Sequence, residues 1–209
     1  ISLKMALETE NQSKEFMIGI LGDSGAGKSA LTTRFLKNEY VEGDKAEQPS
    51  DENATKTLTL ANGKKVTVTV YDSGPYCSSR CTNQRKDDCW NNSNGLIFVI
   101  PLDENPKHYH EIGSLETRRR LAAAGISSEV SAIIVGSKCD AISDDQRKMS
   151  LKEAQAFALE NQCEYFDVSA KDGTNVEEVF MRMTELIDEA KTSWNEKNQP
   201  KEKEEEKCA

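Results

Sequence analysis

The sequence predicts an α/β fold: a three-layer sandwich in which a mostly parallel, six-stranded sheet with one antiparallel hairpin is covered by helices on both faces. Short apolar segments typical of buried strands alternate along the chain with segments of helical periodicity. The dipeptide Asn62-Gly63 joins two strand-like segments, and Asn-Gly in such a place is a strong indication of a hairpin. A glycine-rich loop at 22–29 separates the first strand from the first helix.

Six segments are expected to form the strands. The first and the fourth are continuous apolar runs, as in strands that are buried on both faces. In the third, alternate valines share one face and polar side chains the other, which indicates unequal burial of the two faces. The strands are expected at 15–21, 55–60, 65–71, 95–100, 130–135 and 165–168.

Four segments have the apolar spacing of helices. Leu31 and Phe35 stand four residues apart directly after the glycine-rich loop, so both are expected on the covered face of the first helix. In the last helix, the apolar residues expected on the inner face are Val179, Phe180, Met183 and Ile187. The helices are expected at 30–36, 108–124, 151–160 and 176–192.

One domain is expected over residues 15–194, after a polar N-terminal extension at 1–14. Residues 195–209 alternate lysine and glutamate, which is the composition of a solvated, disordered tail. Within the domain, the polar segment 40–53 has no periodicity and is predicted to be a long exposed loop that is functional or mobile, and the polar, irregular segment 77–94 is predicted to be a second mobile element.

Composition and charge exclude several classes of protein. The chain has 27 basic and 36 acidic residues, a net charge of −9, which argues against nucleic acid as a partner. No apolar run approaches the length of a membrane span, and residues 1–15 lack the apolar core of a secretory signal. The six cysteines are therefore expected to be free thiols in a reducing, cytoplasmic compartment. Cys77, Cys81 and Cys89 lack the paired spacing of a zinc site.

The glycine-rich loop carries the chemistry. Gly22-Asp23-Ser24-Gly25-Ala26-Gly27-Lys28-Ser29 fits the pattern G-x-x-x-x-G-K-[ST], in which backbone N–H groups surround phosphate oxygens at a helix N-terminus. Lys28 is expected to contact the β- and γ-phosphates, and the hydroxyl of Ser29 to bind Mg²⁺. The residues expected to bind the phosphates are Ser24, Gly25, Ala26, Gly27, Lys28, Ser29 and Ala30.

Three further polar groups follow predicted strands. Asp72 ends the third strand, where a carboxylate can hold Mg²⁺ through a water molecule. Ser137-Lys138-Cys139-Asp140 follows the fifth strand, and Ser169-Ala170-Lys171 follows the sixth. Because ligands bind outside the carboxyl ends of parallel strands, these groups are expected to form one site with the phosphate loop.

Taken in order, these four segments resemble the Ras-superfamily small GTPases, which are P-loop proteins, and Asp23-Ser24-Gly25 is Rab-like within that superfamily. The resemblance covers about 15–194 and implies guanine nucleotide, GTP or GDP, with Mg²⁺. It places Asp140 on the base, where a carboxylate accepts two hydrogen bonds that guanine offers and adenine does not. It also implies that Lys138 lies on the base plane, that the Ala170 N–H donates to the guanine oxygen, and that Tyr40 covers the other face.

Four departures from the family pattern stand out. Ser137 replaces an asparagine, and its shorter side chain is expected to weaken nucleotide binding by about 1–2 kcal/mol. Ser50 stands where the family has a Mg²⁺-binding threonine, in a first loop three residues longer and more acidic than usual. Pro75 replaces a glycine and has no N–H for the γ-phosphate. Tyr76 replaces the glutamine that orients the attacking water. Lys28, Ser50 and Tyr76 are thus the candidate catalytic residues.

Two functions from different classes follow. The first is an atypical small GTPase, a slow GTP hydrolase that acts as a molecular switch in membrane traffic or signalling. The alternative is a pseudo-GTPase scaffold with little or no hydrolysis; a nucleotide kinase would leave the last two motifs unexplained. The resemblance implies a monomer with effector, exchange-factor and activating proteins as partners. Membrane contact would require a lipidated C-terminus at endomembranes, and Cys208 fits no C-a-a-X pattern.

Overall fold

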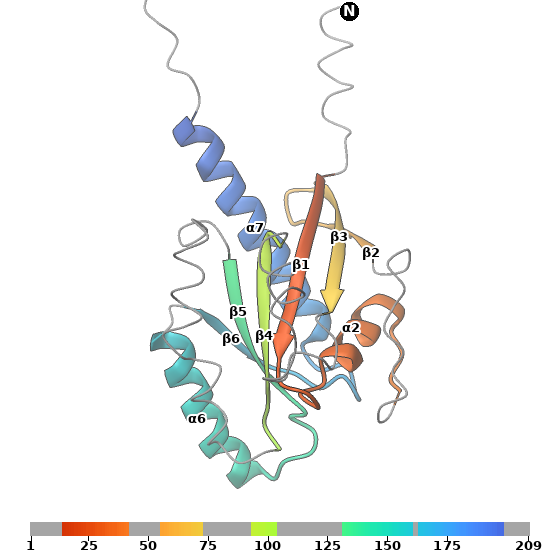
Figure 1. Ribbon diagram of the computed structural model, residues 1–209, viewed down its shortest axis with the longest axis vertical. Coiled ribbons are helices and arrows are strands. Elements are labelled where there is room, and N and C mark those ends of the chain that lie inside the picture. Colours follow the sequence, from red (N-terminus) through yellow and green to blue (C-terminus); the bar gives the residue numbers. More distant parts are fainter. Residues whose placement is uncertain (1–13, 42–54, 73–92, 104–130, 161–162, 199–209) are drawn as a thin grey trace, which may run out of the picture.

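Six strands form one sheet in the order β2-β3-β1-β4-β5-β6 (Figure 1). The structure is a computed structural model, and it describes residues 14–41, 55–72, 93–103, 131–160 and 163–198. Only β2 and β3 pair antiparallel among these strands. The strands are β1 (Lys14–Gly22), β2 (Thr55–Thr59), β3 (Lys65–Asp72), β4 (Gly95–Pro101), β5 (Ser131–Ser137) and β6 (Glu164–Asp167). All six were predicted, so the expected fold class is confirmed.

In the part of the chain that the structure describes, three helices cover the two faces of this sheet. α2 (Lys28–Lys37) and α7 (Val176–Asn198) pack on one face, and α6 (Asp144–Glu160) packs on the other (Figure 1). α6 begins seven residues before the predicted start at 151. The prediction missed these residues because the first turn is polar and has no apolar periodicity. α7 extends six residues past the predicted end at 192, and thus beyond residue 194. The helix predicted at 108–124 lies outside the described residues.

The core has one apolar cluster on each side of the sheet. On the side of α2 and α7, the rings of Phe35 and Phe180 stack with their centroids 3.8 Å apart. Leu31 and Phe35 are buried as predicted, and so are all four residues expected on the inner face of α7. Gly95 allows this packing, because a Cβ there would lie 2.4 Å from the sulfur of Met183. The apolar spacing in the sequence therefore predicts correctly which faces of α2 and α7 pack against the sheet.

The hairpin between β2 and β3 turns through three residues. The N–H of Leu60 donates to the carbonyl of Lys64 over 2.9 Å, and the N–H of Gly63 donates to the carbonyl of Leu60 over 2.8 Å. Gly63 has a φ of 81°, a left-handed conformation that closes a three-residue loop with little strain. The Asn62-Gly63 signal thus predicts the hairpin correctly, and the glycine is the residue that the turn requires.

Lys56 connects the edge strand β2 to the two helices on one face of the sheet, α2 and α7. Its Nζ donates to the backbone carbonyl of Phe35 in α2 over 2.8 Å, and it lies 4.5 Å from the centroid of the aromatic ring of Phe35. It also contacts both carboxylate oxygens of Glu177 in α7, at 2.8 and 2.9 Å. One side chain therefore joins three elements.

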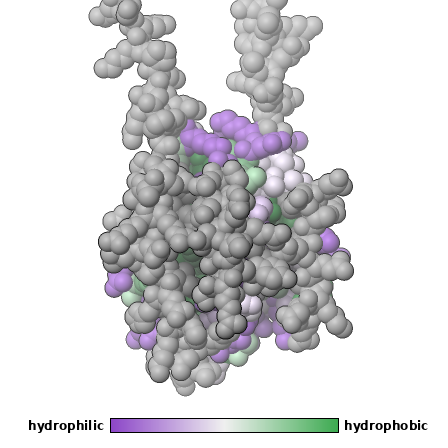
Figure 2. All heavy atoms as spheres, in the orientation of Figure 1, coloured by the Kyte–Doolittle hydropathy of each residue, from purple (hydrophilic) through white to green (hydrophobic). Residues whose placement is uncertain are grey.

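The end of the molecule where β1 begins is rich in hydrophilic atoms (Figure 2). Lys64 donates to the mostly buried carboxylate of Asp188 on α7, and Lys14 lies 3.7 Å from the same oxygen. The ammonium of Lys191 lies 4.4 Å from the centroid of the Phe16 ring. This lysine cluster lies at the amino end of β1, opposite the phosphate loop.

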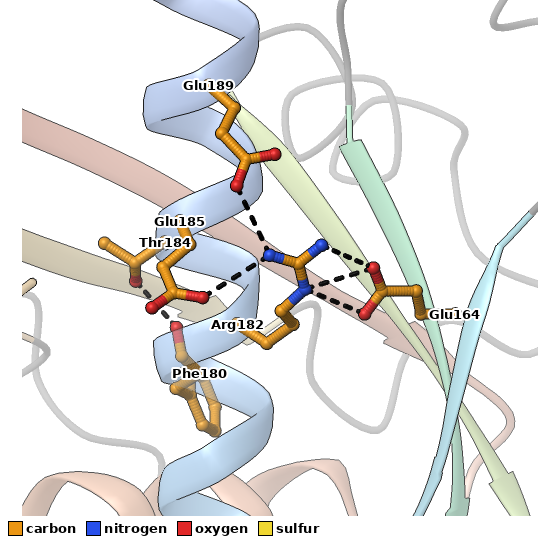
Figure 3. A network of polar contacts seen from close by, with 6 residues as sticks. All are labelled: Glu164, Phe180, Arg182, Thr184, Glu185 and Glu189. Carbon is orange, nitrogen blue, oxygen red and sulfur yellow. Dashed lines mark hydrogen bonds and ion pairs between the residues drawn. The ribbon is translucent and has the colours of Figure 1, made fainter. Parts of the chain in front are cut away.

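Arg182 joins α7 to the short strand β6 (Figure 3). Its Nε lies 3.0 Å from both carboxylate oxygens of Glu164, and one of its terminal nitrogens lies 2.7 Å from Oε1. The other terminal nitrogen lies 3.4 Å from carboxylates of Glu185 and Glu189 on the same helix. A bidentate contact of this kind fixes geometry as well as charge, so it holds β6 against the helix.

Candidate nucleotide site at the carboxyl ends of the strands

The phosphate loop connects β1 to α2, as predicted, and its glycines are required by its shape. Gly22 has a φ of 149°, and a Cβ there would lie 2.3 Å from the carbonyl oxygen of Val99 in β4. Gly25 and Gly27 have φ values of 83° and 89°, which disfavour any other residue. Gly27 also precedes the first residue of α2, so the positive end of the helix dipole faces the loop. The loop therefore has the backbone geometry of an anion-binding site.

Lys28 is buried beneath this loop. Its Nζ donates to the carbonyls of Gly22 and Asp23, over 2.8 and 2.7 Å. Two carbonyl acceptors fix the position of the ammonium group within the curve of the loop. This is the arrangement expected of a lysine that neutralises a bound phosphate.

Ser29 and Asp72 lie together, although 43 residues separate them. The hydroxyl of Ser29 donates to Oδ2 of Asp72 over 2.6 Å, which joins the start of α2 to the end of β3. Hard oxygen donors of this type suit Mg²⁺, which in proteins takes few side-chain ligands and completes its shell with phosphates and water. The two residues thus fit the predicted metal site. Among the described residues, no three His, Cys, Asp or Glu side chains gather as a metal site.

Ser137 connects the end of β5 to the phosphate loop. Its buried hydroxyl donates to the carbonyl of Ala26 over 2.6 Å and lies 3.2 Å from the carbonyl of Ile100. A hydroxyl has one proton to donate, so the shorter contact is the principal hydrogen bond. The serine therefore retains a direct connection to the loop, which the sequence argument did not foresee.

If the site binds the guanine nucleotide that the resemblance implies, Ser137→Ala should accelerate GDP dissociation about fivefold to tenfold, because the carbonyl of Ala26 loses its donor. Ser137→Asn, which restores the family residue, is expected to slow dissociation about fivefold or more. Both rates can be measured with a fluorescent GDP analogue and an excess of unlabelled GDP. Ser131→Ala, at the other end of β5, is the matched control. Equal rates for Ser137→Ala and the parent protein would contradict the assigned role.

Lys138, Cys139 and Asp140 form the turn after β5. Lys138 has a φ of 60°, a left-handed conformation that is uncommon for a residue with a side chain. Its Nζ lies 3.0 Å from Oδ2 of Asp103, at the end of the neighbouring strand. Asp140 is exposed, and the adjacent N–H of Cys139 donates to the carbonyl of Val168 over 3.1 Å. The turn is therefore held against the loop that follows β6.

That loop contains Ser169, Ala170 and Lys171, as predicted. The N–H of Gly173 donates to the carbonyl of Ser169 over 2.9 Å, and the N–H of Asp172 donates to its hydroxyl over 3.2 Å. Hydrogen bonds from the hydroxyl and the N–H of Thr174 lower the pKa of Asp172, so this carboxylate stays charged and holds the turn. The segment is thus a compact, internally bonded loop.

Sequence reasoning missed Arg34, which connects this loop to α2. Its Nε donates to the carbonyl of Ala170 over 2.6 Å, and a terminal nitrogen donates to the carbonyl of Lys171 over 2.5 Å. No local pattern marks the residue, because its acceptors are backbone atoms 136 and 137 positions away. Only the fact that the phosphate-loop helix and the last loop share one sheet edge could have suggested such a contact.

The structure describes only some of the remaining residues that were predicted to belong to the site. Tyr40, expected to cover the base, is 38% exposed just after α2. Ser50, Pro75, Tyr76, Cys77, Cys81, Cys89 and Cys208 lie outside the described residues. Neither of the two cysteines that the structure describes, Cys139 and Cys163, forms a disulfide within the described residues. Within the described ranges, no helix combines the length and the apolar character needed to cross a bilayer.

The comparisons with known proteins agree with this site. The model of the Ras family matches residues 17–189. The GTP-binding protein ypt3 of Schizosaccharomyces pombe is 31% identical over 173 residues, which are 82% of this chain and 76% of the relative. The Ras-related protein RABD2c of Arabidopsis thaliana is 30% identical over 173 residues, 82% of this chain and 80% of the relative. The Ras-related protein Ral-a of Drosophila melanogaster is 26% identical over 176 residues, 83% and 81% of the two chains.

The chain therefore belongs to the Ras family of small GTPases, with a Rab-like character. The predicted superfamily is confirmed. Members of this family are molecular switches that bind GTP and GDP, generally with Mg²⁺, and act through regulators and effectors.

Proposed function

We propose that this protein is an atypical small GTPase that binds GTP and GDP with Mg²⁺ and hydrolyses GTP slowly. The observation that carries the proposal is the meeting of four segments at one sheet edge: the phosphate loop, the Ser29–Asp72 pair, the turn at 137–140 and the loop at 169–171. Lys28 would bind the β- and γ-phosphates, and Ser29 would ligate the metal directly. Asp72 would act through a water molecule, and Ser50 would complete the metal site in the GTP state.

Base recognition is assigned to the other half of the site. Asp140 would accept from two N–H groups of guanine, and the Ala170 N–H would donate to its oxygen. The stem of Lys138 would lie on the base while its ammonium contacts Asp103, 3.0 Å away. Tyr40 is sufficiently exposed to cover the opposite face. At the same two positions adenine has an acceptor nitrogen and a C–H and thus no donor for Asp140, so guanine is the preferred base.

Slow hydrolysis follows from the residues after Asp72. Catalysis in this class is almost entirely orientation and electrostatic stabilisation. Pro75 cannot donate a backbone hydrogen bond to the γ-phosphate, and the loss of such a donor at a comparable oxyanion site costs about 2.7–4 kcal/mol. Tyr76 has no carboxamide that could accept from water and donate to phosphate together. We therefore propose turnover at or below the order of 10⁻⁴ s⁻¹ known for unassisted Ras.

The combined change Pro75→Gly with Tyr76→Gln is expected to raise single-turnover GTP hydrolysis about tenfold or more, beyond either single change. The first substitution restores an N–H donor, and the second restores the water-orienting amide. The measurement loads each variant with GTP, adds Mg²⁺ and follows the release of phosphate.

The control for this experiment is the dissociation rate of GDP, which should change little because neither residue belongs to the base or the phosphate loop. If the parent protein hydrolysed GTP faster than the double variant, an unidentified group would have to position the water. The proposed cause of slow turnover would then be wrong.

The alternative is a pseudo-GTPase that holds nucleotide on a scaffold without a working switch. It is favoured by the same two residues, because Pro75 and Tyr76 stand where the γ-phosphate is sensed. The nucleotide retained by protein purified without added ligand, identified by ion-exchange chromatography after denaturation, separates the two. A mixture of GDP and GTP fits slow hydrolysis, whereas GTP alone, or little of either nucleotide, fits the pseudo-GTPase.

Roles in membrane traffic or signalling are proposed from the likeness to Rab, Ypt and Ral proteins. On this proposal the protein is a cytoplasmic monomer that attaches to endomembranes only through lipidation of its C-terminal region. Its partners would be exchange factors, activating proteins and effectors that recognise the loops around the nucleotide.

A further inference from the structure

Arg34 has a set of contacts that the proposed mechanism does not use. It lies in the last turn of α2, where a cation is favoured by the helix dipole. Besides its two bonds to Ala170 and Lys171, a third guanidinium nitrogen donates to the carbonyl of Asn38 over 3.1 Å. The stem passes Gly173, where an added Cβ would lie 4.0 Å from Cδ of Arg34. The planar, charged fork is thus held on three backbone carbonyls at once.

These contacts fix the orientation of one peptide group in the 169–171 loop. A trans peptide is planar, with its C=O and N–H on opposite sides. Because the carbonyl of Ala170 points at Arg34, the N–H of Lys171 points away from Arg34. The preceding peptide is fixed as well, because the carbonyl of Ser169 accepts from Gly173 and the N–H of Ala170 must point the other way.

The N–H groups of Ala170 and Lys171 differ from the next three N–H groups of the loop in their hydrogen bonding. The N–H groups of Asp172, Gly173 and Thr174 all donate hydrogen bonds inside the loop. Within the part of the chain that the structure describes, those of Ala170 and Lys171 make no such bond. Ala170 is half-buried beside the turn that carries Asp140, so the loop presents two adjacent, oriented donors at the base-binding end of the site.

We propose that Arg34 is a positioning residue for base recognition: by holding the carbonyls of Ala170 and Lys171 it orients the N–H of Lys171 and fixes the loop in the shape that directs the N–H groups of Ala170 and Lys171 at the carbonyl oxygen of guanine. The inference rests on the proposed guanine-nucleotide site. It adds that the phosphate-binding helix sets the geometry of the base contact through this side chain. Selectivity for the oxygen at position 6 of the base then depends on Arg34, whereas selectivity for the 2-amino group depends on Asp140.

Three nucleotides distinguish these two contacts. 6-Thio-GDP differs from GDP at the oxygen that the loop would contact, and IDP lacks the 2-amino group that Asp140 would contact. We expect the parent protein to prefer GDP over either by about tenfold. In Arg34→Ala the preference over 6-thio-GDP should fall to about twofold or less, while the preference over IDP stays unchanged. Arg34→Lys keeps the charge without the planar fork and should lie between the two.

Competition against a fluorescent GDP analogue measures both preferences on one preparation, so a smaller folded fraction cancels from each ratio. Lys37→Ala, an exposed lysine in the same turn of α2, is the matched control and should retain both preferences. If the two preferences fell together, or if neither changed in Arg34→Ala, the positioning role would be overturned. Failure of the parent protein to bind GDP would instead overturn the proposed function.

Discussion

Replacing Asp140 with asparagine is expected to reverse the base preference from guanine to xanthine. The carboxylate accepts from two N–H groups of guanine, whereas a carboxamide offers one acceptor and can donate to the extra oxygen of xanthine. A site built around hydrogen bonds discriminates strongly, because a mismatched base leaves polar groups unpaired. We expect GDP affinity to fall about 100-fold and XDP affinity to rise about tenfold or more.

Titration with GDP, XDP and ADP measures this change. The parent protein should bind GDP at least about tenfold more tightly than ADP. Glu178→Gln, the same chemical change at an exposed position of α7, is the control and should alter nothing. Equal binding of ADP and GDP by the parent protein would show that Asp140 does not read the base.

Lys28→Ala is expected to abolish nucleotide binding at micromolar concentrations, through a loss of about 100-fold or more. The ammonium of Lys28 is buried and held by the carbonyls of Gly22 and Asp23. Removal of one partner from a buried charge pair costs about 3–5 kcal/mol, since the phosphates would lose their cation. The measurement is GDP affinity by calorimetry, with circular dichroism to establish that the variant is folded.

Lys37→Ala provides the comparison for this experiment too, because it removes a lysine from the exposed end of the same helix. Its affinity should match that of the parent protein. If a folded Lys28→Ala variant bound GDP as tightly as the parent, the loop would hold the phosphates through its backbone alone. The lysine would then be structural.

The sequence was sufficient to predict the strands, the helix faces and the phosphate loop, because each of these is encoded locally. The glycines of the loop are a case in point: the positive φ values of Gly25 and Gly27 are what the motif demands. The pairing of Ser29 with Asp72 was also predictable, since both residues stand at ends of elements that meet at one sheet edge.

Contacts between a side chain and a distant backbone atom could not be predicted in this way. Arg34 and Lys56 both donate to backbone carbonyls, and a carbonyl carries no signature in the sequence. The hydrogen bond of Ser137 to Ala26 was missed for the same reason, although the residue itself was recognised. The early start of α6 was missed because its first turn has no apolar period.

The contacts of Lys56 have a consequence for how the protein avoids self-association. β2 is the outermost strand on its side of the described sheet, and its sequence alternates threonine with Lys56 and Leu58. Among the described strands β2 has a neighbour on one side only, and an edge of this kind is a place where a strand of another molecule could add. The charge of Lys56 is turned inward, onto Phe35 and Glu177, and a strand that shifted to accept a neighbour would have to break these contacts. Charged side chains on edge strands are one way in which proteins limit such pairing, so we expect Lys56 to oppose strand addition as well as to join β2 to the helices.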